Sequence, residues 1–440
     1  MSVETGPIAR HLGFSTAVAV IVSNMVGTGV FTSLGFQVGG THSGFALLAL
    51  WGVGGLVALC GALSYAELGV AYPHSGGEYV YLGRVYSKLM GFLGGWVSMT
   101  VGFAAPIALA ALAFGRYLSA TIPIQPMVAS LAVLVLVAMV HAWDLHLARR
   151  FQVSLTSIVL ALIVGFIVAG VAYRTPQPLS FAPTPAAWSE LGQPAFAVSL
   201  IFVSYAFSGW NAAGYVAGEV EHPSRTIPLS LTVGTILVAC LYLLLNWTFL
   251  RTIPLERLNG VVEVGALSAQ AMFGPSGGRI MSGMIAMVLV ATISGLVLAG
   301  SRVTEAVTRD LVRLSLIGRR TSRNVPRNAI LLQIAFTIAL LLTGSVERVM
   351  TYAGFTLNLN TTLAVIGVYV LRRREPGRVL AYRTFGYPIV PFFFILTSLW
   401  TLGFVLTERP IASVAGLVTI LIGATIYWWD SRGAVISAPR

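Results

Sequence analysis

The chain has 440 residues, of which 56% are hydrophobic and only 10% are charged, and its formal net charge is +12. A soluble protein of this length needs far more polar surface, so the composition excludes a water-soluble globular protein and places the chain in a lipid bilayer. The six histidines lack metal-ligand spacing and both cysteines lie in apolar segments, so we expect no metal site, no cofactor and no redox chemistry.

Apolar windows without any Asp, Glu, Lys or Arg recur along the whole chain. A helix needs about 20 such residues to cross about 30 Å of hydrocarbon. We therefore predict an all-α integral membrane protein with twelve transmembrane helices and no soluble domain. The predicted spans are 14–36, 43–66, 89–115, 120–143, 151–173, 194–218, 227–250, 280–301, 328–346, 349–371, 387–407 and 410–429.

The basic residues concentrate in alternate loops. If the N-terminus is cytoplasmic, the inner segments hold 20 of the 27 Lys and Arg residues and the outer segments hold 7. This positive-inside bias predicts a multi-pass protein of the cell inner (plasma) membrane with both termini in the cytoplasm. The same bias accounts for the net charge without a nucleic-acid partner.

A proline-rich outer loop at 174–193 divides the chain. Its four prolines are typical of an extended linker. Five predicted spans lie on each side of this loop, and two more spans follow them. The longest other connections are expected at 251–279 on the outer side and 302–327 on the inner side.

Two spans contain runs of small residues at mid-span. The first motif is Met25–Phe31 (MVGTGVF) and the second motif is Tyr205–Asn211 (YAFSGWN). Each glycine costs about 1 kcal/mol of helix stability relative to Ala. Close helix packing is one explanation, but the motifs lie five spans apart in halves of opposite topology. That arrangement favours interrupted helices around a transporter site near the bilayer midplane.

An interrupted helix offers main-chain groups to a ligand. It frees N–H groups at the start of one half-helix and C=O groups at the end of the other, and the helix dipole adds partial charge at both ends. Unpaired main chain at this depth is tolerated only where it lines a protected cavity. A small zwitterion fits such a site.

Six short segments are informative together: VGTGVF (26–31), SGGEYVYL (75–82), FSGWN (207–211), GEVEHPSRTIP (218–228), SRVTEAVTRD (301–310) and LRRREP (371–376). These segments resemble the amino acid, polyamine and organocation (APC) transporter superfamily, and within it the L-type amino acid transporter branch of the amino acid permeases. The resemblance covers essentially the whole chain. It implies one transporter domain over 1–440 with a LeuT-like 5+5 inverted repeat, in which helices 1 and 6 are broken. The repeats would cover about 12–175 and 190–375, and peripheral helices would cover about 384–429.

The resemblance also implies roles for the residues of both motifs. The substrate carboxylate would be held by Gly27, Thr28, Gly29 and the amide of Val30, and the amino group by carbonyls of Met25, Tyr205 and Ser208. Tyr205 matches an aromatic gate, although a packing tyrosine is the alternative. Asn211 would bond substrate or brace the segment. The remaining residues assigned to the binding site are Val26, Phe207 and Gly209.

The sequence does not determine the identity of the coupling ion. Many relatives carry a lysine in the fifth span in place of a bound sodium ion, but the matching position here is Val159. Thr292 and Ser294 could donate oxygen to Na⁺, or they could be ordinary polar packing residues. Coupling to H⁺ or Na⁺ and simple exchange are all compatible. The loop Ser119–Pro126 lacks the cysteine that links heteromeric relatives to a partner, so we expect no disulfide-linked partner subunit.

The predicted function is secondary active transport, by a permease or exchanger, of neutral L-amino acids by alternating access. A cationic amino acid or polyamine would need an opposing carboxylate, and no window contains one. Glu67 and Glu78 near the inner membrane surface are functional candidates, as carboxylates near a membrane are, but salt bridges with Arg84 or another loop arginine are favoured. Side-chain specificity is expected from Gly102–Ala105 and Phe355–Asn358. The alternatives are a transporter of cationic amino acids or polyamines, a non-transporting amino acid sensor and an intramembrane enzyme.

Overall fold

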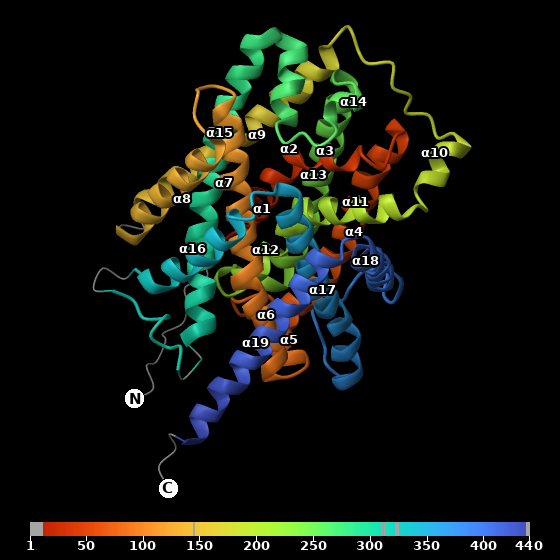
Figure 1. Cartoon of the computed structure of the whole chain (residues 1–440). Helices are drawn as coiled ribbons and strands as arrows, with labels where there is room; N and C mark the ends of the chain where they lie inside the picture. Colours follow the sequence, from red (N-terminus) through yellow and green to blue (C-terminus); the bar gives the residue numbers. More distant parts are fainter. Residues whose placement is uncertain (1–11, 144–145, 310, 312, 322–324, 437–440) are drawn as a thin grey trace.

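The computed structural model describes residues 12–143, 146–309, 311, 313–321 and 325–436, with side chains except at 143, 146–158 and 432–436 (Figure 1). Within these residues the secondary structure is helical, and one isolated bridge pairs Leu12 with Val220. Both chain termini, for which the charge pattern predicts a cytoplasmic location, lie outside the described residues.

Nine helical segments of the described chain are long and apolar enough to cross a membrane. Each coincides with a predicted span. They are α1 (Phe14–Met25) with α2 (Thr28–Thr32), α4 (Gly44–Ala71), α6 (Lys88–Val97) with the π-helix η1 (Ser98–Phe103) and α7 (Ala104–Ser119), α11 (Pro194–Phe207) with the 3₁₀ turn η2 (Ser208–Asn211) and α12 (Ala212–Tyr215), α13 (Pro223–Thr252), α15 (Val264–Arg309), α17 (Val346–Arg374), α18 (Ile389–Glu408) and α19 (Pro410–Ile436).

Three other predicted spans correspond to helices whose described apolar parts are shorter. These are α8 (Pro126–Trp143), α9 (His146–Ala172) and α16 (Arg327–Leu341). The short connecting helices are α3 (Leu34–Gln37), α5 (Glu78–Val85), α10 (Pro185–Glu190), the 3₁₀ turn η3 (Ala217–Glu219) and α14 (Leu255–Leu258).

Local sequence signals mark where many helices begin. The hydroxyl groups of Ser43, Ser87 and Ser345 accept hydrogen bonds from N–H groups in the first turns of α4, α6 and α17. Such caps satisfy donors that have no partner within the helix. Proline stands at the start of α11 and α13, where its missing N–H costs nothing.

The eighth predicted span is longer than expected. The window 280–301 lies inside α15, which runs over 46 residues with a kink at Gly274 (φ 76°) next to Pro275. The prediction of an outer connection over the whole of 251–279 is therefore wrong from Val264 onward. Glycine and proline at 274–278 are typical of a loop, but here they bend a helix that continues on both sides.

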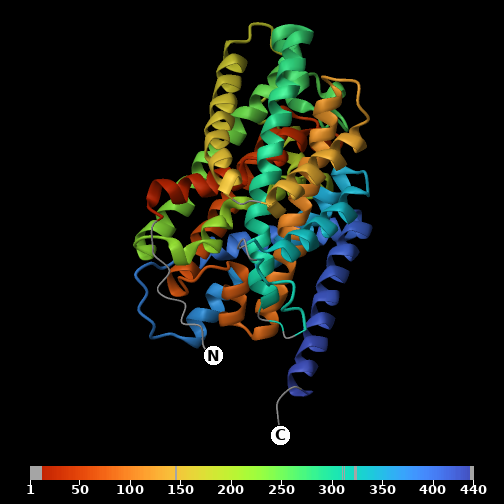
Figure 2. The same ribbon diagram turned by 90° about the vertical axis from the view of Figure 1, so that its left-hand side faces the viewer.

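The helices form a bundle with two distinguishable ends (Figures 1 and 2). α13 packs along α4 and α1, α15 packs along α7, and α11 contacts α4, α17 and α18. α5 and the C-terminal end of α15 lie at the lower end in Figure 1, here called the α5 face. α10 and α14 lie at the upper end, here called the α14 face. α19 lies at the edge of the bundle in Figure 2, and only 17% of its apolar window is buried.

Candidate functional site

The first motif contains the end of one helix and the start of the next. α1 ends at Met25 and α2 begins at Thr28. Between them, Val26 (φ −74°, ψ 101°) and Gly27 (φ −158°, ψ −148°) have extended main chains. The N–H of Val26 still bonds to the Val22 carbonyl. The main chain that follows departs from the helical hydrogen-bond pattern.

The second motif lies where α11 gives way to the 3₁₀ turn η2. α11 ends at Phe207, η2 covers Ser208–Asn211, and α12 follows directly. A 3₁₀ turn is tighter than an α-helix and its hydrogen bonds are poorer, and within a longer helix it often marks a hinge. Ser208 and Gly209 are half-buried, in contrast to the fully buried Phe207.

The two motifs touch through glycine. A Cβ atom on Gly29 would lie 2.6 Å from the Cα of Ala206, closer than real side chains approach main chain. A Cβ on Gly209 would likewise collide with the carbonyl group of Asn24 and lie 2.6 Å from the nitrogen of Met25. Each motif therefore uses one glycine to let the main chain of the other approach, which explains both positions.

Tyr242 of α13 contacts the main chain at both motifs. Its hydroxyl donates to the carbonyl of Met25 and lies 3.2 Å from the carbonyl of Ala206. The ring packs on Phe207 (centroids 5.1 Å apart) and edge-on against Trp51 (5.5 Å). The role of Tyr242 was not predicted from the sequence. The available signal was a tyrosine in an apolar span, where a buried hydroxyl needs an acceptor.

A cavity of about 310 Å³ lies beside the crossing of the two motifs. Val26 and Val30 of the first motif are buried in packing, at 6% and 0% exposure, and Ser294 is 6% exposed. The cavity brings together most of the predicted site residues, namely Met25, Gly27, Thr28, Gly29, Tyr205, Phe207, Ser208, Gly209, Asn211 and Thr292.

The predicted side-chain pocket also contributes to this cavity. Gly102 and Phe103, from the π-helix η1, form part of the wall, and so do Leu357 and Asn358 of α17. Ala104 and Ala105 are fully buried in packing instead. A π-helical turn within an α-helix is frequent at functional sites, and here it lies at the cavity wall.

Polar contacts join the motifs to each other and to neighbouring helices. The hydroxyls of Thr28 and Tyr205 lie 3.4 Å apart, so the tyrosine proposed as a gate lies directly against the first motif. The side-chain amide of Asn211 donates to Oε1 of Glu78, 2.5 Å away. Asn211 therefore braces the second motif against α5.

The two glutamates near the α5 face differ in their pairing. Glu67 forms a salt bridge with Arg372 of α17 (2.7 Å), so the expectation of a salt bridge is confirmed there, and the N–H of Thr384 donates to the same oxygen (2.6 Å). The expectation is wrong for Glu78, which has no ion pair among the described residues and accepts from Tyr65 as well as Asn211. Glu78 lines the cavity, so the cavity wall contains a carboxylate although the apolar windows do not.

The candidate sodium donors already have hydrogen-bond partners. Thr292 donates to the carbonyl of Val288 (3.1 Å), and the hydroxyl of Ser294 lies 3.2 Å from Nε2 of His141. Val159 is buried, with 7% exposure. In the described part of the chain, no group of three or more His, Cys, Asp or Glu side chains is arranged to hold a metal ion.

The wall of the cavity extends toward the α5 face, where it includes Glu78 of α5 and the exposed Arg302 of α15. A second cavity, of about 1210 Å³, lies on the α14 face and includes Gly35 and Asn259 in its wall. Val30, Phe31 and Leu34, which follow the first motif, are buried.

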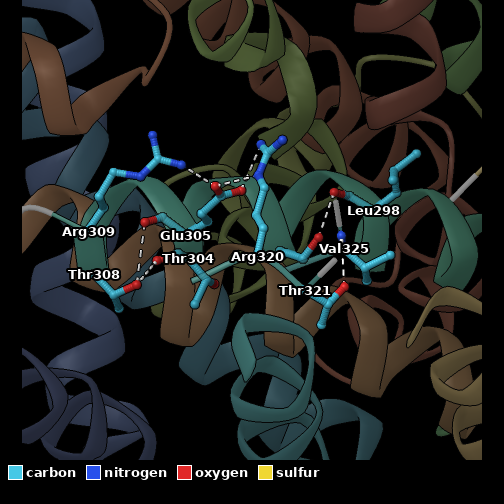
Figure 3. A network of polar contacts seen from close by, with 9 residues as sticks. Leu298, Thr304, Glu305, Thr308, Arg309, Arg320, Thr321 and Val325 are labelled. Atoms are coloured by element: carbon cyan, nitrogen blue, oxygen red, sulfur yellow. Dashed lines mark hydrogen bonds and ion pairs between the residues drawn. The ribbon is translucent and has the colours of Figure 1, made fainter. Parts of the chain in front are cut away.

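A network of ion pairs lies at the C-terminal end of α15 (Figure 3). Glu305 of α15, whose side chain is 3% exposed, pairs with Arg309 and with Arg320 (2.7 Å). The hydrogen bonds to Glu305 raise the pKa of the Arg320 guanidinium. This network holds the 313–321 segment against α15 at the α5 face.

Known proteins resemble the chain over nearly its whole length. The human cystine/glutamate transporter is 27% identical over 444 residues, covering 98% of this chain and 87% of that protein. The serine/threonine exchanger SteT of Bacillus subtilis (strain 168) is 26% identical over 443 residues, covering 97% and 98%. The Asc-type amino acid transporter 1 of Mus musculus is 27% identical over 454 residues, covering 98% and 83%.

Residues 12–428 match the amino acid permease family, a region that contains both motifs and the cavity wall. Its members, like the relatives above, are transport proteins, and this sets the intramembrane enzyme aside. The chain belongs to the amino acid permease family of the APC superfamily, in the branch that resembles the L-type transporters.

Proposed function

We propose that the chain is a secondary active transporter, a permease or exchanger, that moves neutral L-amino acids by alternating access. The observation that carries the proposal is the crossing of the two motifs, with Gly29 against Ala206 and Gly209 against Asn24, beside a cavity of about 310 Å³. A cavity of this size accommodates an amino acid. The names of the relatives, which refer to cystine, glutamate, serine, threonine and Asc-type amino acids, support the same substrate class.

The proposed binding mode uses main-chain groups of both motifs. The amides of the turn from Gly27 to Val30 would receive the substrate carboxylate, and the carbonyls of Tyr205 and Ser208 would receive the ammonium. The Met25 carbonyl already accepts from Tyr242, so its role would be shared. Tyr205 would close over the bound substrate, guided by its contact with Thr28.

A neutral side chain is favoured by the wall of the cavity opposite these groups. Gly54, Val57 and Ala58 of α4 line it together with Gly102 and Leu357. These residues offer no charge to a substrate side chain, and small residues leave room for one of modest size. Glu78, the carboxylate in the wall, accepts a hydrogen bond from the side-chain amide of Asn211.

The proposed architecture is one transporter domain with twelve spans in a LeuT-like 5+5 inverted repeat. The repeats would cover about 12–175 and 190–375, with the motifs as the breaks in helices 1 and 6, and α8, α9 and α16 as spans beyond the nine of full length. Peripheral helices at about 384–429 fit the lipid exposure of α18 and α19, whose windows are only 33% and 17% buried.

The proposed location is the cell inner membrane with the α5 face and both termini in the cytoplasm. The cavity, whose wall extends toward the α5 face, would then correspond to an inward-open state. The second cavity, on the α14 face, would be the outer vestibule, ready to join the motifs when the inner side closes. No covalently linked partner subunit is proposed.

The experiment is counterflow in proteoliposomes. Vesicles are loaded in turn with single neutral, basic or acidic amino acids, and uptake of a labelled neutral amino acid is followed with no ion gradient. We expect uptake above protein-free vesicles when neutral L-amino acids are inside, and little with D-enantiomers. Absence of uptake for every internal amino acid would show that the proposed function is wrong. Stronger counterflow with basic than with neutral amino acids would overturn the substrate class.

A further inference from the structure

Glu78 is a buried acid in the cavity wall that the binding mode above does not use. It begins α5 directly after Gly77, whose positive φ (54°) turns the chain and places it against the ring of Tyr215. The side chain is 1% exposed and lines the same cavity as Asn211 and Tyr215. A buried ionisable side chain without a charged partner, next to a cavity, is a candidate for a functional role.

One oxygen of this carboxylate is satisfied and the other is not. Oε1 accepts from the hydroxyl of Tyr65 at 3.0 Å and from the amide of Asn211 at 2.5 Å. Oε2 is buried and has no hydrogen-bond partner among the described residues. Tyr215 lies beside the carboxylate, but its hydroxyl pairs with Ser98 at 3.0 Å. A buried acceptor without a partner is costly, so Oε2 is suited to a ligand that arrives through the cavity.

No basic side chain in the described chain neutralises Glu78. Arg372 pairs with Glu67, and Arg374 donates to the carbonyl of Val85. The other basic groups nearby are exposed. The titratable and charged groups on the surrounding elements are Tyr65 and Glu67 on α4, Tyr81 and Arg84 on α5, Lys88 on α6, Tyr215 on α12, Arg302 on α15, and Arg372 and Arg374 on α17.

The donors around Glu78 favour a proton over a metal cation. Sodium or another hard cation needs several oxygen ligands at once, whereas the carboxylate is surrounded by a side-chain amide and three phenols, of Tyr65, Tyr81 and Tyr215. A single proton on Oε2 removes the charge without any further ligand. Burying an unpaired charge is costly, so a ligand that cancels the charge on Oε2 is favoured.

We propose that Glu78 binds the coupling proton of the transport cycle. The inference rests on the proposed transport function. It identifies the coupling ion, which the two motifs do not determine. One proton binds to Oε2 while the cavity is open to one side and dissociates when the cavity is open to the other. Because Asn211 bonds directly to Oε1, each change of charge at Glu78 acts on η2 and hence on the second motif.

The test is proton-driven accumulation in proteoliposomes at zero membrane potential. For one proton per substrate, a gradient of one pH unit supports up to about tenfold accumulation of a neutral amino acid. We expect accumulation of several-fold in the wild type, together with acidification of a dye-loaded lumen when substrate is added outside. Glu78→Gln, which keeps an acceptor for Tyr65 and Asn211, should still perform counterflow but should equilibrate without accumulation.

Further variants separate a proton site from a structural one. Tyr65→Phe removes a donor that favours the charged carboxylate, so the midpoint of the pH profile of uptake should move to higher pH. Glu375→Gln changes a glutamate with a 44% exposed side chain, in the Glu375–Arg378 pair outside both cavities, and should leave accumulation intact. Accumulation that follows a sodium gradient at constant pH, no gradient-driven accumulation in the wild type, or accumulation retained by Glu78→Gln would each overturn the proposal. Loss of counterflow by the wild type would instead refute the proposed function.

Discussion

The hydroxyl of Tyr242 donates to the main-chain carbonyl of Met25 and lies 3.2 Å from that of Ala206. Met25 ends α1, and Ala206 lies one residue before the end of α11, so one side chain of α13 contacts the main chain at both motifs. Because Tyr242 is fully buried, water cannot replace these two contacts of its hydroxyl. α13 is therefore coupled to any movement of one motif relative to the other.

Tyr242→Phe is predicted to weaken transport without preventing insertion into the membrane. The change leaves the Met25 carbonyl without its donor, and an unpaired buried polar group costs about 1–3 kcal/mol. Counterflow should fall by about fivefold or more, and the thermal midpoint of the purified protein should drop. Tyr352→Phe is the matched control, since its hydroxyl pairs with Thr419 of α19. Equal effects of the two variants would argue against a special role for Tyr242.

The glycines of the first motif are predicted to differ in their tolerance of a methyl group. A Cβ on Gly29 meets main chain of Ala206 at 2.6 Å, so Gly29→Ala should separate the motifs and prevent stable folding. A Cβ on Gly27 meets only Cγ2 of Thr292, at 3.7 Å. Gly27→Ala should therefore fold but bind substrate about tenfold more weakly, because the methyl group enters the cavity.

Two measurements distinguish these outcomes. Size-exclusion profiles in detergent report folding, and equilibrium binding of a labelled amino acid reports the site. Gly403→Ala is the control, since no atom lies within 4 Å of the added Cβ. Normal binding by Gly27→Ala would contradict the assignment of the substrate carboxylate to this turn.

Hydrophobicity was sufficient to locate the helices but not their ends. The predicted span 43–66 stops before Glu67, whereas α4 continues to Ala71 because Glu67 pairs with Arg372. The span 280–301 likewise stops before Arg302, whereas α15 continues to Arg309. A charged residue ends an apolar window, but partners from distant parts of the chain allow the helix to continue, and such partners are not visible in local sequence.

The site was partly predictable for the same reason. Glycine runs are local signals, so the two motifs could be found, and the structure places them in contact. Tyr242 and Glu78 form their contacts with residues of other helices. The sequence around a single residue does not show which distant residues it contacts. Glu78 was expected to pair with a neighbouring arginine such as Arg84, but Arg84 is exposed while Glu78 turns inward to Tyr65.

Transport is predicted to be independent of sodium. Thr292 donates to the carbonyl of Val288 and Ser294 pairs with His141, which are contacts typical of ordinary polar packing residues. Thr292→Ala and Ser294→Ala should therefore leave the ratio of uptake in sodium buffer to uptake in choline buffer at about one, as in the wild type. A wild-type ratio well above one that either variant abolishes would restore these residues as ion ligands.

Glu67→Gln is predicted to destabilise the α5 face strongly. Glu67 is fully buried, receives two hydrogen bonds from Arg372 and accepts from the N–H of Thr384, so it joins α4, α17 and the segment before α18. The guanidinium of Arg372 also lies 3.7 Å from the ring centre of Tyr387. Removing one member of a buried pair leaves the other charge without compensation and typically costs about 3–5 kcal/mol.

The matched control for this prediction is Glu375→Gln. That glutamate pairs with Arg378 at 2.7 Å, but 44% of its side chain is exposed, and exposed pairs contribute about 0–1 kcal/mol. Thermal unfolding of the purified variants should show a clearly lower midpoint for Glu67→Gln and almost no shift for Glu375→Gln. Because the Glu67 pair joins α4 to α17, and both helices line the cavity, Glu67→Gln should also slow counterflow at temperatures where it remains folded. Similar midpoints for the two variants would mean that the buried pair adds no more to stability than the exposed one.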